Sequence, residues 1–114
     1  MKRISYIIPV YNEAENLPGL YEELRQVAEQ IATPYEILFV DDGSTDDSAA
    51  VVERMAARDP HVRLIAMERN SGQSAALAAG FAMAVGDVII TMDGDGQNDP
   101  ADIPAMLRWY GEYD

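Results

Sequence analysis

The chain lacks cysteine and has no apolar stretch long enough to cross a bilayer. With no cysteine among its 114 residues, it can form neither a disulfide nor a thiolate metal site. The uncharged apolar run of residues 4–11 is far too short for a transmembrane helix, and Lys2-Arg3 is not followed by the hydrophobic region of a signal peptide. These features predict a soluble domain of the cytoplasm.

Positive charge is scarce as well. Eight Lys and Arg residues stand against twenty Asp and Glu residues, which gives a formal net charge of -12. Binding along a nucleic acid needs a cationic face, so no nucleic-acid partner is expected. A single phosphorylated small molecule remains compatible with this charge, because one or two metal ions can neutralise its phosphates locally.

Three phosphate- and cofactor-binding motifs are missing. No G-x-x-x-x-G-K-[ST] sequence is present, which excludes a P-loop ATPase, and the first predicted strand is not followed by the G-x-G-x-x-G of a dinucleotide-binding fold. Lys2 is the only lysine, so the late lysine that a flavodoxin-like phosphoacceptor domain requires is absent. Nicotinamide, flavin and phosphoacceptor functions are therefore disfavoured.

The hydrophobic pattern predicts alternating strands and helices. Runs of branched apolar residues, typical of strands covered on both faces, span residues 4–10, 35–40, 62–67 and 88–92. Helical segments are predicted over residues 17–31, after Ser44-Thr45-Asp46-Asp47, over residues 74–85, and from Pro100. Asn16 is in position to cap the first helix, and small residues around Gly80 would let the third lie close to a sheet.

The order β-α-β-α-β-α-β-α predicts a single α/β domain over residues 1–114, with a parallel, Rossmann-like sheet. In such sheets, ligands bind beyond the carboxyl ends of the strands. Polar clusters follow all four predicted strands and begin at Tyr11, Asp41, Asn70 and Asp93. We therefore expect these four loops to converge.

Asp93 and Asp95 follow the last predicted strand directly. Alternate residues of an extended chain point the same way, so both carboxylates can reach one divalent cation. An EF-hand would need glycine and glutamate where this chain has Asn98 and Pro104. A phosphatase with an aspartate nucleophile carries its pair on an early strand, followed by Thr or Val rather than Gly96-Gln97. A metal site for a phosphorylated substrate is favoured over a plain Asp-Gly turn.

Two earlier loops carry candidate nucleotide-binding residues. Asp41-Asp42-Gly43-Ser44 is a turn in which Gly43 can adopt a positive φ, and one of its aspartates can accept the N–H groups of a nucleobase. Tyr11 can cover a base or ribose and Glu13 can bind ribose hydroxyls, although an ordinary loop tyrosine and a helix-leading acid fit these residues equally well. His61 is interpreted as a surface loop residue.

Taken together, the four loops resemble a known family. Their sequences are Ile8-Pro9-Val10-Tyr11-Asn12-Glu13, Val40-Asp41-Asp42-Gly43-Ser44-Thr45-Asp46, Arg69-Asn70-x-Gly72-Gln73 and Asp93-x-Asp95-x-Gln97-x-x-Pro100. In this order and spacing they resemble the inverting family 2 glycosyltransferases of GT-A fold. Within that family they are most similar to the polyprenyl-phosphate glycosyltransferases, which include dolichyl-phosphate mannose synthases.

The resemblance implies a role for each matching position. Residues that would bind the donor nucleotide are Pro9, Tyr11, Glu13, Val40 and Asp42, with Asp41 supporting the turn. Residues that would meet the donor diphosphate are Asp93, Gly94 and Asp95. A Mg²⁺ or Mn²⁺ ion would be held by Asp95 and Gln97, with Asp93 directly or through water, and the two aspartates would be catalytic through this metal. The implied donor is a UDP- or GDP-sugar, and the implied acceptor is a polyprenyl phosphate.

The chain departs from the family pattern in two respects. Gly96 stands where this subgroup more often has leucine. Family members also continue well past the fourth predicted helix, so we expect residues 1–114 to be the nucleotide-sugar-binding part of a longer enzyme, inactive alone and able to self-associate through an exposed sheet edge. The general base, the acceptor half and any membrane segments would lie elsewhere, and the full-length protein would work at the cytoplasmic face of a membrane.

Two other functions stay open. A nucleotidyltransferase also places acidic metal ligands at strand ends, although its usual glycine- and lysine-bearing phosphate loop is unlike Tyr11-Asn12-Glu13. A non-catalytic binding or assembly module can keep the fold of a lost enzyme. Metal-dependent nucleotide binding and turnover would distinguish these possibilities from a glycosyltransferase.

Overall fold

The protein is built on a parallel sheet with helices on both faces. The computed structural model describes residues 3–92. Its strands are β1 (Ile4–Val10), β2 (Tyr35–Asp41), β3 (Val62–Ala66) and β4 (Val88–Thr91), and they pair in parallel in the order β3-β2-β1-β4.

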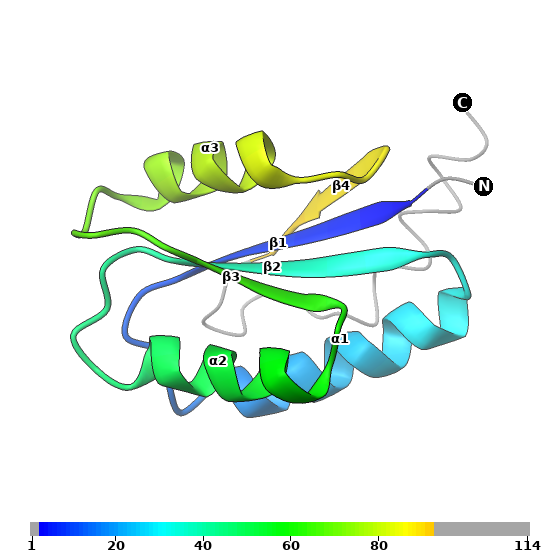
Figure 1. The fold of residues 1–114 in the computed structure, drawn as a ribbon, viewed down its shortest axis with the longest axis horizontal. Helices are drawn as coiled ribbons and strands as arrows, with labels where there is room; N and C mark the ends of the chain where they lie inside the picture. The colour runs from blue at the N-terminus through cyan, green and yellow to red at the C-terminus, as the bar shows by residue number, and fades with distance from the viewer. Residues whose placement is uncertain (1–2, 93–114) are drawn as a thin grey trace.

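The helices of the described part are α1 (Leu17–Ile31), α2 (Ser48–Arg58) and α3 (Gln73–Met83). Figure 1 shows α1 and α2 on one side of the sheet and α3 on the other. The predicted α/β, Rossmann-like alternation is confirmed, and the elements end within two residues of their predicted limits. The fourth predicted helix, from Pro100, lies outside the described residues. Within residues 3–92, no helix has the length and apolar character needed to span a bilayer.

β1 lies between two apolar cores. Tyr6 and Ile8 pack on the side of α1 and α2, whereas Ile7 packs on the side of α3, and all three are fully buried. Because both faces of the sheet are covered, an apolar residue is needed at nearly every position of this strand. This explains why β1 was predictable from its continuous apolar run.

Small residues let α3 lie close to the sheet, as predicted. A Cβ atom added at Gly80 would lie 2.6 Å from Cγ2 of Ile7 and 3.3 Å from Cγ2 of Val40. Ala76, one turn earlier, is also fully buried. The close packing of α3 fixes the position at which its first turn meets the carboxyl edge of the sheet.

The prediction that the Asn16 side chain caps α1 is wrong. Asn16 occupies the N-cap position, but it has helical φ and ψ of -88° and -20° and makes no side-chain cap hydrogen bond. The backbone N–H groups of Asn16 and Leu17 already donate to the carbonyl of Glu13 at 3.0 and 3.1 Å, which forms a tight turn before the helix. Within this turn, Nδ2 of Asn16 donates to Oε2 of Glu13 at 2.7 Å.

A buried polar network holds the amino end of β4. Glu36 of β2 accepts hydrogen bonds from Oγ of Ser5 at 2.6 Å, from the backbone N–H of Val85 at 2.8 Å and from Nη1 of Arg63 at 3.0 Å. Burial alone would raise the pKa of Glu36, but these hydrogen bonds lower it below its usual value. The ionised carboxylate therefore ties the α3–β4 connection to β1 and β3.

A second polar cluster surrounds Asp59, just before β3. Its Oδ2 accepts a hydrogen bond from the hydroxyl of Tyr21 at 2.7 Å, and its Oδ1 lies 2.8 Å from Nδ1 of His61. The His61 ring stacks on Tyr35 with centroids 4.1 Å apart. His61 is therefore a loop residue, as predicted, and lies at the amino end of the strands.

Candidate functional site

Three loops meet at the carboxyl edge of the sheet. They follow β1, β2 and β3 and span residues 11–16, 42–47 and 67–72. Side chains of the first and second loops accept hydrogen bonds from the backbone of the following loop, and Ser48 at the start of α2 accepts one from the first loop, so the predicted convergence is confirmed for these three. The fourth predicted loop begins at Asp93, outside the described residues. The last described residue, Met92, donates its N–H to the carbonyl of Ile7 at 3.0 Å, so the chain leaves the sheet beside β1.

The first and second loops are joined through Asn12. Its Oδ1 accepts the backbone N–H of Thr45 at 2.8 Å and that of Asp46 at 3.2 Å. Its own N–H donates to Oγ of Ser44 at 2.9 Å. Each loop thus supplies both donors and acceptors to the other.

The start of α2 strengthens this junction. Ser48 is fully buried, and its Oγ accepts the N–H of Glu13 at 2.9 Å. Oδ1 of Asp46 accepts the N–H of Ser48 at 2.9 Å, so an aspartate two residues upstream satisfies an amide that the first turn of α2 leaves without a helical partner. The hydroxyl of Ser48 also donates to Oδ1 of Asp46, and this bond, together with that from the Ser48 backbone N–H, orients the Asp46 carboxylate and lowers its pKa.

The second and third loops are joined through Asp42. Its two carboxylate oxygens accept the backbone N–H groups of Ser71 and Gly72, each at 2.8 Å. Asp42 is 4% exposed, so the acceptor of these two bonds is buried, whereas Ser71 is exposed. Asp41 instead accepts the N–H of Ser44 at 3.2 Å, which supports the turn as predicted.

Gly43 lets the third loop lie against the second. It adopts a φ of 72°, the left-handed conformation that the turn predicted. A Cβ atom at this position would lie only 2.5 Å from the carbonyl carbon of Arg69 and 2.5 Å from the nitrogen of Asn70. Glycine is therefore required here both by its backbone conformation and by the close approach of another chain segment.

The structure places the predicted nucleotide-binding residues at different depths. Tyr11 is 44% exposed, and Pro9 and Glu13 are half-buried. Val40, by contrast, is fully buried and packs in the core beneath α3. The predicted diphosphate and metal residues lie outside the described part of the chain; they are Asp93, Gly94, Asp95 and Gln97. In residues 3–92, no group of three or more His, Asp or Glu side chains could hold a metal ion.

Sequence reasoning did not find Asn12 and Ser48 as organisers of this edge. Both act through contacts between segments more than thirty positions apart in the chain. The available signal was an asparagine two residues after the end of a strand, since asparagine tolerates left-handed backbone better than most residues. Its φ in the structure is 52°.

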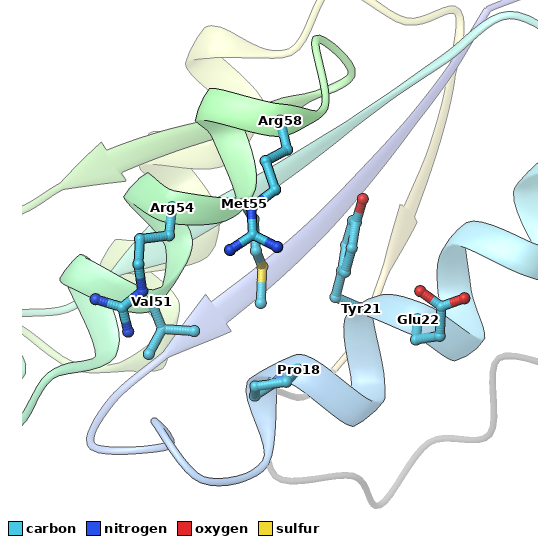
Figure 2. Close-up of a pocket in the computed structure, with 7 residues that line it drawn as sticks. All are labelled: Pro18, Tyr21, Glu22, Val51, Arg54, Met55 and Arg58. Atoms are coloured by element: carbon cyan, nitrogen blue, oxygen red, sulfur yellow. The ribbon is translucent and has the colours of Figure 1, made fainter.

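A separate pocket of about 340 Å³ lies between α1 and α2. Figure 2 shows the residues that line it, which are Pro18, Tyr21, Glu22, Val51, Arg54, Met55 and Arg58. All seven belong to the two helices, and none belongs to the loops at the carboxyl edge. The three-loop edge and this pocket are therefore distinct features.

Comparison with known sequences identifies relatives of the chain. The profile of glycosyl transferase family 2 matches residues 5–114. An undecaprenyl-phosphate 4-deoxy-4-formamido-L-arabinose transferase of Pectobacterium carotovorum is 48% identical over 111 residues, which are 96% of this chain and 34% of the relative. A transferase of the same name from Sodalis glossinidius is 46% identical over 107 residues, 93% of this chain and 33% of the relative. The chain thus spans about a third of the length of the curated relatives that it matches.

Solved structures share the fold. A mannosyltransferase from Pyrobaculum calidifontis, in complex with GDP-Man and Mn²⁺, aligns with a TM-score of 0.69 and 30% identity over 82% of this chain and 28% of that one. TarS 1-349 of S. aureus, in complex with UDP-GlcNAc, aligns with a TM-score of 0.77 over 98% of this chain and 32% of that one; at 24% identity, this likeness bears on the fold alone. From the profile match over nearly all of its residues, and from the parallel GT-A sheet that it shares with these structures, we conclude that the chain belongs to glycosyl transferase family 2.

Proposed function

We propose that the chain is the nucleotide-sugar-binding part of a longer glycosyltransferase. This enzyme would transfer a sugar from a UDP- or GDP-sugar to a polyprenyl phosphate, in a metal-dependent reaction that inverts the anomeric carbon. The observation that carries the proposal is the three-loop junction, which brings Tyr11, Glu13 and Asp42 to one edge of the sheet. The undecaprenyl-phosphate transferases among its relatives, and the GDP-Man and Mn²⁺ of the Pyrobaculum enzyme, support it.

Different residues of the described part can bind different groups of a nucleotide. The exposed ring of Tyr11 offers an apolar face to a base or ribose. Glu13 uses Oε2 for Asn16, which leaves Oε1 to accept a ribose hydroxyl. A carboxylate has about four acceptor positions, so Asp42 keeps capacity for a nucleobase N–H beyond the two backbone groups that it already accepts.

The loop after β4 would supply the chemistry at the diphosphate. The proposed metal ligands are Asp93, Asp95 and Gln97, and their carboxylate and amide oxygens are donors that suit Mg²⁺ and Mn²⁺. The bound ion would offset the negative charge that grows on the nucleoside diphosphate as it leaves. The acceptor phosphate is already anionic, so it needs little activation by a general base.

Isothermal titration of the full-length protein with UDP and GDP, with and without Mn²⁺, tests this proposal. We expect metal-dependent binding of at least one nucleotide, and Asp95→Ala should abolish it. Asp87→Ala is the matched control, because Asp87 precedes β4 at the opposite end of the strand, where its carboxylate accepts the N–H of Arg3 at 3.0 Å. Metal-independent binding, or normal affinity in Asp95→Ala, would refute the assigned role of the loop.

The place of action and the state of assembly are also part of the proposal. A polyprenyl phosphate is anchored in a bilayer, so the full-length enzyme would act at the cytoplasmic face of a membrane.

Within residues 3–92, β4 pairs only with β1, and its second edge is a candidate for self-association of the isolated 114 residues. Sugar transfer by the full-length protein, assayed with polyprenyl phosphate as acceptor, separates an enzyme from a non-catalytic module.

A further inference from the structure

Asn12 has an unusual backbone conformation at the centre of the three-loop edge. Its φ of 52° lies in the left-handed region, which costs most residues energy but which asparagine tolerates better. It sits between Tyr11 and Glu13, two residues of the proposed nucleotide pocket. Any change in the backbone of Asn12 would therefore change where these two side chains point.

The bonds around Asn12 run in both directions between the first two loops. Three consecutive backbone N–H groups of the first loop donate to side chains of the second loop and of the start of α2: residue 12 to Ser44, residue 14 to Asp46, and residue 13 to Ser48, the first residue of α2. In return, Oδ1 of Asn12 accepts the backbone N–H groups of residues 45 and 46 and the hydroxyl of Thr45. A single side-chain oxygen, Oδ1 of Asn12, thus accepts all three of these hydrogen bonds.

We propose that Asn12 is a positioning residue that holds Tyr11 and Glu13 in the geometry that nucleotide binding requires. The inference rests on the proposed function of the three-loop edge. The side-chain oxygen of Asn12 fixes the loop of residues 42–47, and that loop fixes the backbone of residues 12–14 in return. The pocket is thereby ordered before a ligand arrives.

The surroundings of these bonds favour a role in binding over a role in folding. The contacts from Asn12 to Ser44, Thr45 and Asp46 are exposed to solvent, where hydrogen bonds to water compete with them and the net gain in stability is small. A loop that is already ordered does not lose conformational freedom when the ligand binds, so the benefit appears in affinity.

Ala32 provides an internal reference for the backbone conformation. It is the other non-glycine residue with positive φ among residues 3–92, at 59°, and it lies at the carboxyl end of α1, away from the three loops. An alanine methyl group can accept no hydrogen bond. Substitution of Ala32 therefore changes the energy of a left-handed residue without changing the loop junction.

Three variants of the full-length protein separate the contribution of the Asn12 side-chain oxygen to nucleotide affinity from that of the left-handed backbone conformation. Asn12→Gly keeps left-handed φ accessible but removes the acceptor, Asn12→Asp keeps both, and Ala32→Gly is the matched control. We expect Asn12→Gly to weaken UDP or GDP binding in the presence of Mn²⁺ by about tenfold or more, Asn12→Asp to stay within about threefold of wild type, and Ala32→Gly to leave affinity unchanged.

Hydrogen exchange at residues 45 and 46 gives a second readout that needs no ligand. Their amides should exchange faster in Asn12→Gly than in wild type and at the wild-type rate in Asn12→Asp. Normal nucleotide affinity in Asn12→Gly, or unchanged exchange at both amides, would overturn the inference. If the wild-type protein binds no nucleotide, the proposed function is wrong, and so is the role of Asn12 in nucleotide binding. Faster amide exchange in Asn12→Gly would in that case show only that Asn12 holds the two loops together.

Discussion

The carboxylate of Asp42 accepts the backbone N–H of Gly72 at 2.8 Å, although the two residues are 30 positions apart in the chain. Its other oxygen accepts the N–H of Ser71 at the same distance. One buried carboxylate therefore holds the entire turn that leads into α3. Asp42, a residue of the second loop, therefore holds the third loop at the carboxyl edge of the sheet.

Replacement of Asp42 should release this turn. Asp42→Ala leaves two amides without their charged acceptor, and we expect the free energy of unfolding to fall by about 3 kcal/mol in urea denaturation. Asp42→Asn keeps one acceptor oxygen and should lose less. Asp47→Ala is the control, because Asp47 is exposed at the N-cap of α2 and makes no side-chain cap bond; its effect should stay within about 0.5 kcal/mol. Equal effects of Asp42→Ala and Asp47→Ala would contradict the assigned contact.

A series of three glycine substitutions separates backbone strain from steric conflict. Gly43→Ala combines a φ of 72° with backbone atoms 2.5 Å from the new methyl group, and we expect a loss of about 3 kcal/mol or more. Gly72→Ala has a φ of 98° but nothing within 4 Å, so only the strain remains and the loss should be about 1 to 2 kcal/mol.

Gly19→Ala completes the series. Gly19 lies in α1 with nothing within 4 Å of an added methyl group, so the substitution should raise stability by about 0.5 to 1 kcal/mol. All three variants can be compared by urea denaturation. The packing of the third loop against Gly43 is contradicted if Gly43→Ala costs no more than Gly72→Ala.

The local parts of this edge were predictable, and the contacts between its loops were not. Gly43 and its positive φ follow from a turn sequence of four adjacent residues, and the support of that turn by Asp41 spans only three positions. The bonds from Asn12 and Asp42 join segments about thirty positions apart, and no local pattern specifies such partners. The error at Asn16 has a similar cause, because the sequence did not show that a turn at Glu13 would make its backbone helical.

The fold was more predictable than the site because hydrophobic patterning repeats along each element. Both faces of β1 and β2 are covered, so their apolar runs were continuous and unambiguous. Val40 ends one of these runs, and the structure buries it beneath α3. The place against the nucleobase that the family resemblance implies for Val40 stays a prediction.

Stability should depend on pH through Glu36. The folded state holds the pKa of Glu36 below its unfolded value, so the carboxylate stabilises the protein above the unfolded pKa, and this contribution is lost as the pH falls through the folded pKa. Glu36→Gln should lower the free energy of unfolding by about 2 kcal/mol at pH 7, and its difference from wild type should shrink on acidification. Unfolding curves at several pH values check this, and a difference that stays constant with pH would rule out the ionic role.

The hydroxyl of Tyr21 should stabilise the junction of α1 with the segment before β3. Figure 2 shows Tyr21 at the pocket between α1 and α2, and its hydroxyl donates to Asp59 at 2.7 Å. Burial opposes ionisation of Asp59, but the bonds from Tyr21 and His61 outweigh it and lower the pKa of Asp59. Tyr21→Phe should therefore cost about 1 to 2 kcal/mol of stability and raise the pKa of Asp59.

Tyr11→Phe is the control for the loss of stability expected in Tyr21→Phe. Tyr11→Phe removes a hydroxyl from a residue that is 44% exposed, so the free energy of unfolding should change by less than about 0.5 kcal/mol. Thermal unfolding of the two variants, together with titration of Asp59 by NMR, gives the test. A Tyr21→Phe protein as stable as Tyr11→Phe would show that the bond to Asp59 contributes nothing.

The order of the strands has a consequence for biosynthesis. β1 precedes the other strands in the chain, yet it lies between β2 and β4, and Ile4 is paired with Val88. A ribosome needs roughly 3 to 10 seconds to add the fifty or so residues between the end of β2 and the end of β4. Throughout that interval one edge of β1, a strand that is almost entirely buried in the finished fold, has no partner from the described part of its own chain. The nascent protein is therefore most exposed to chaperones, and to pairing with other nascent chains, before its last described strand is made.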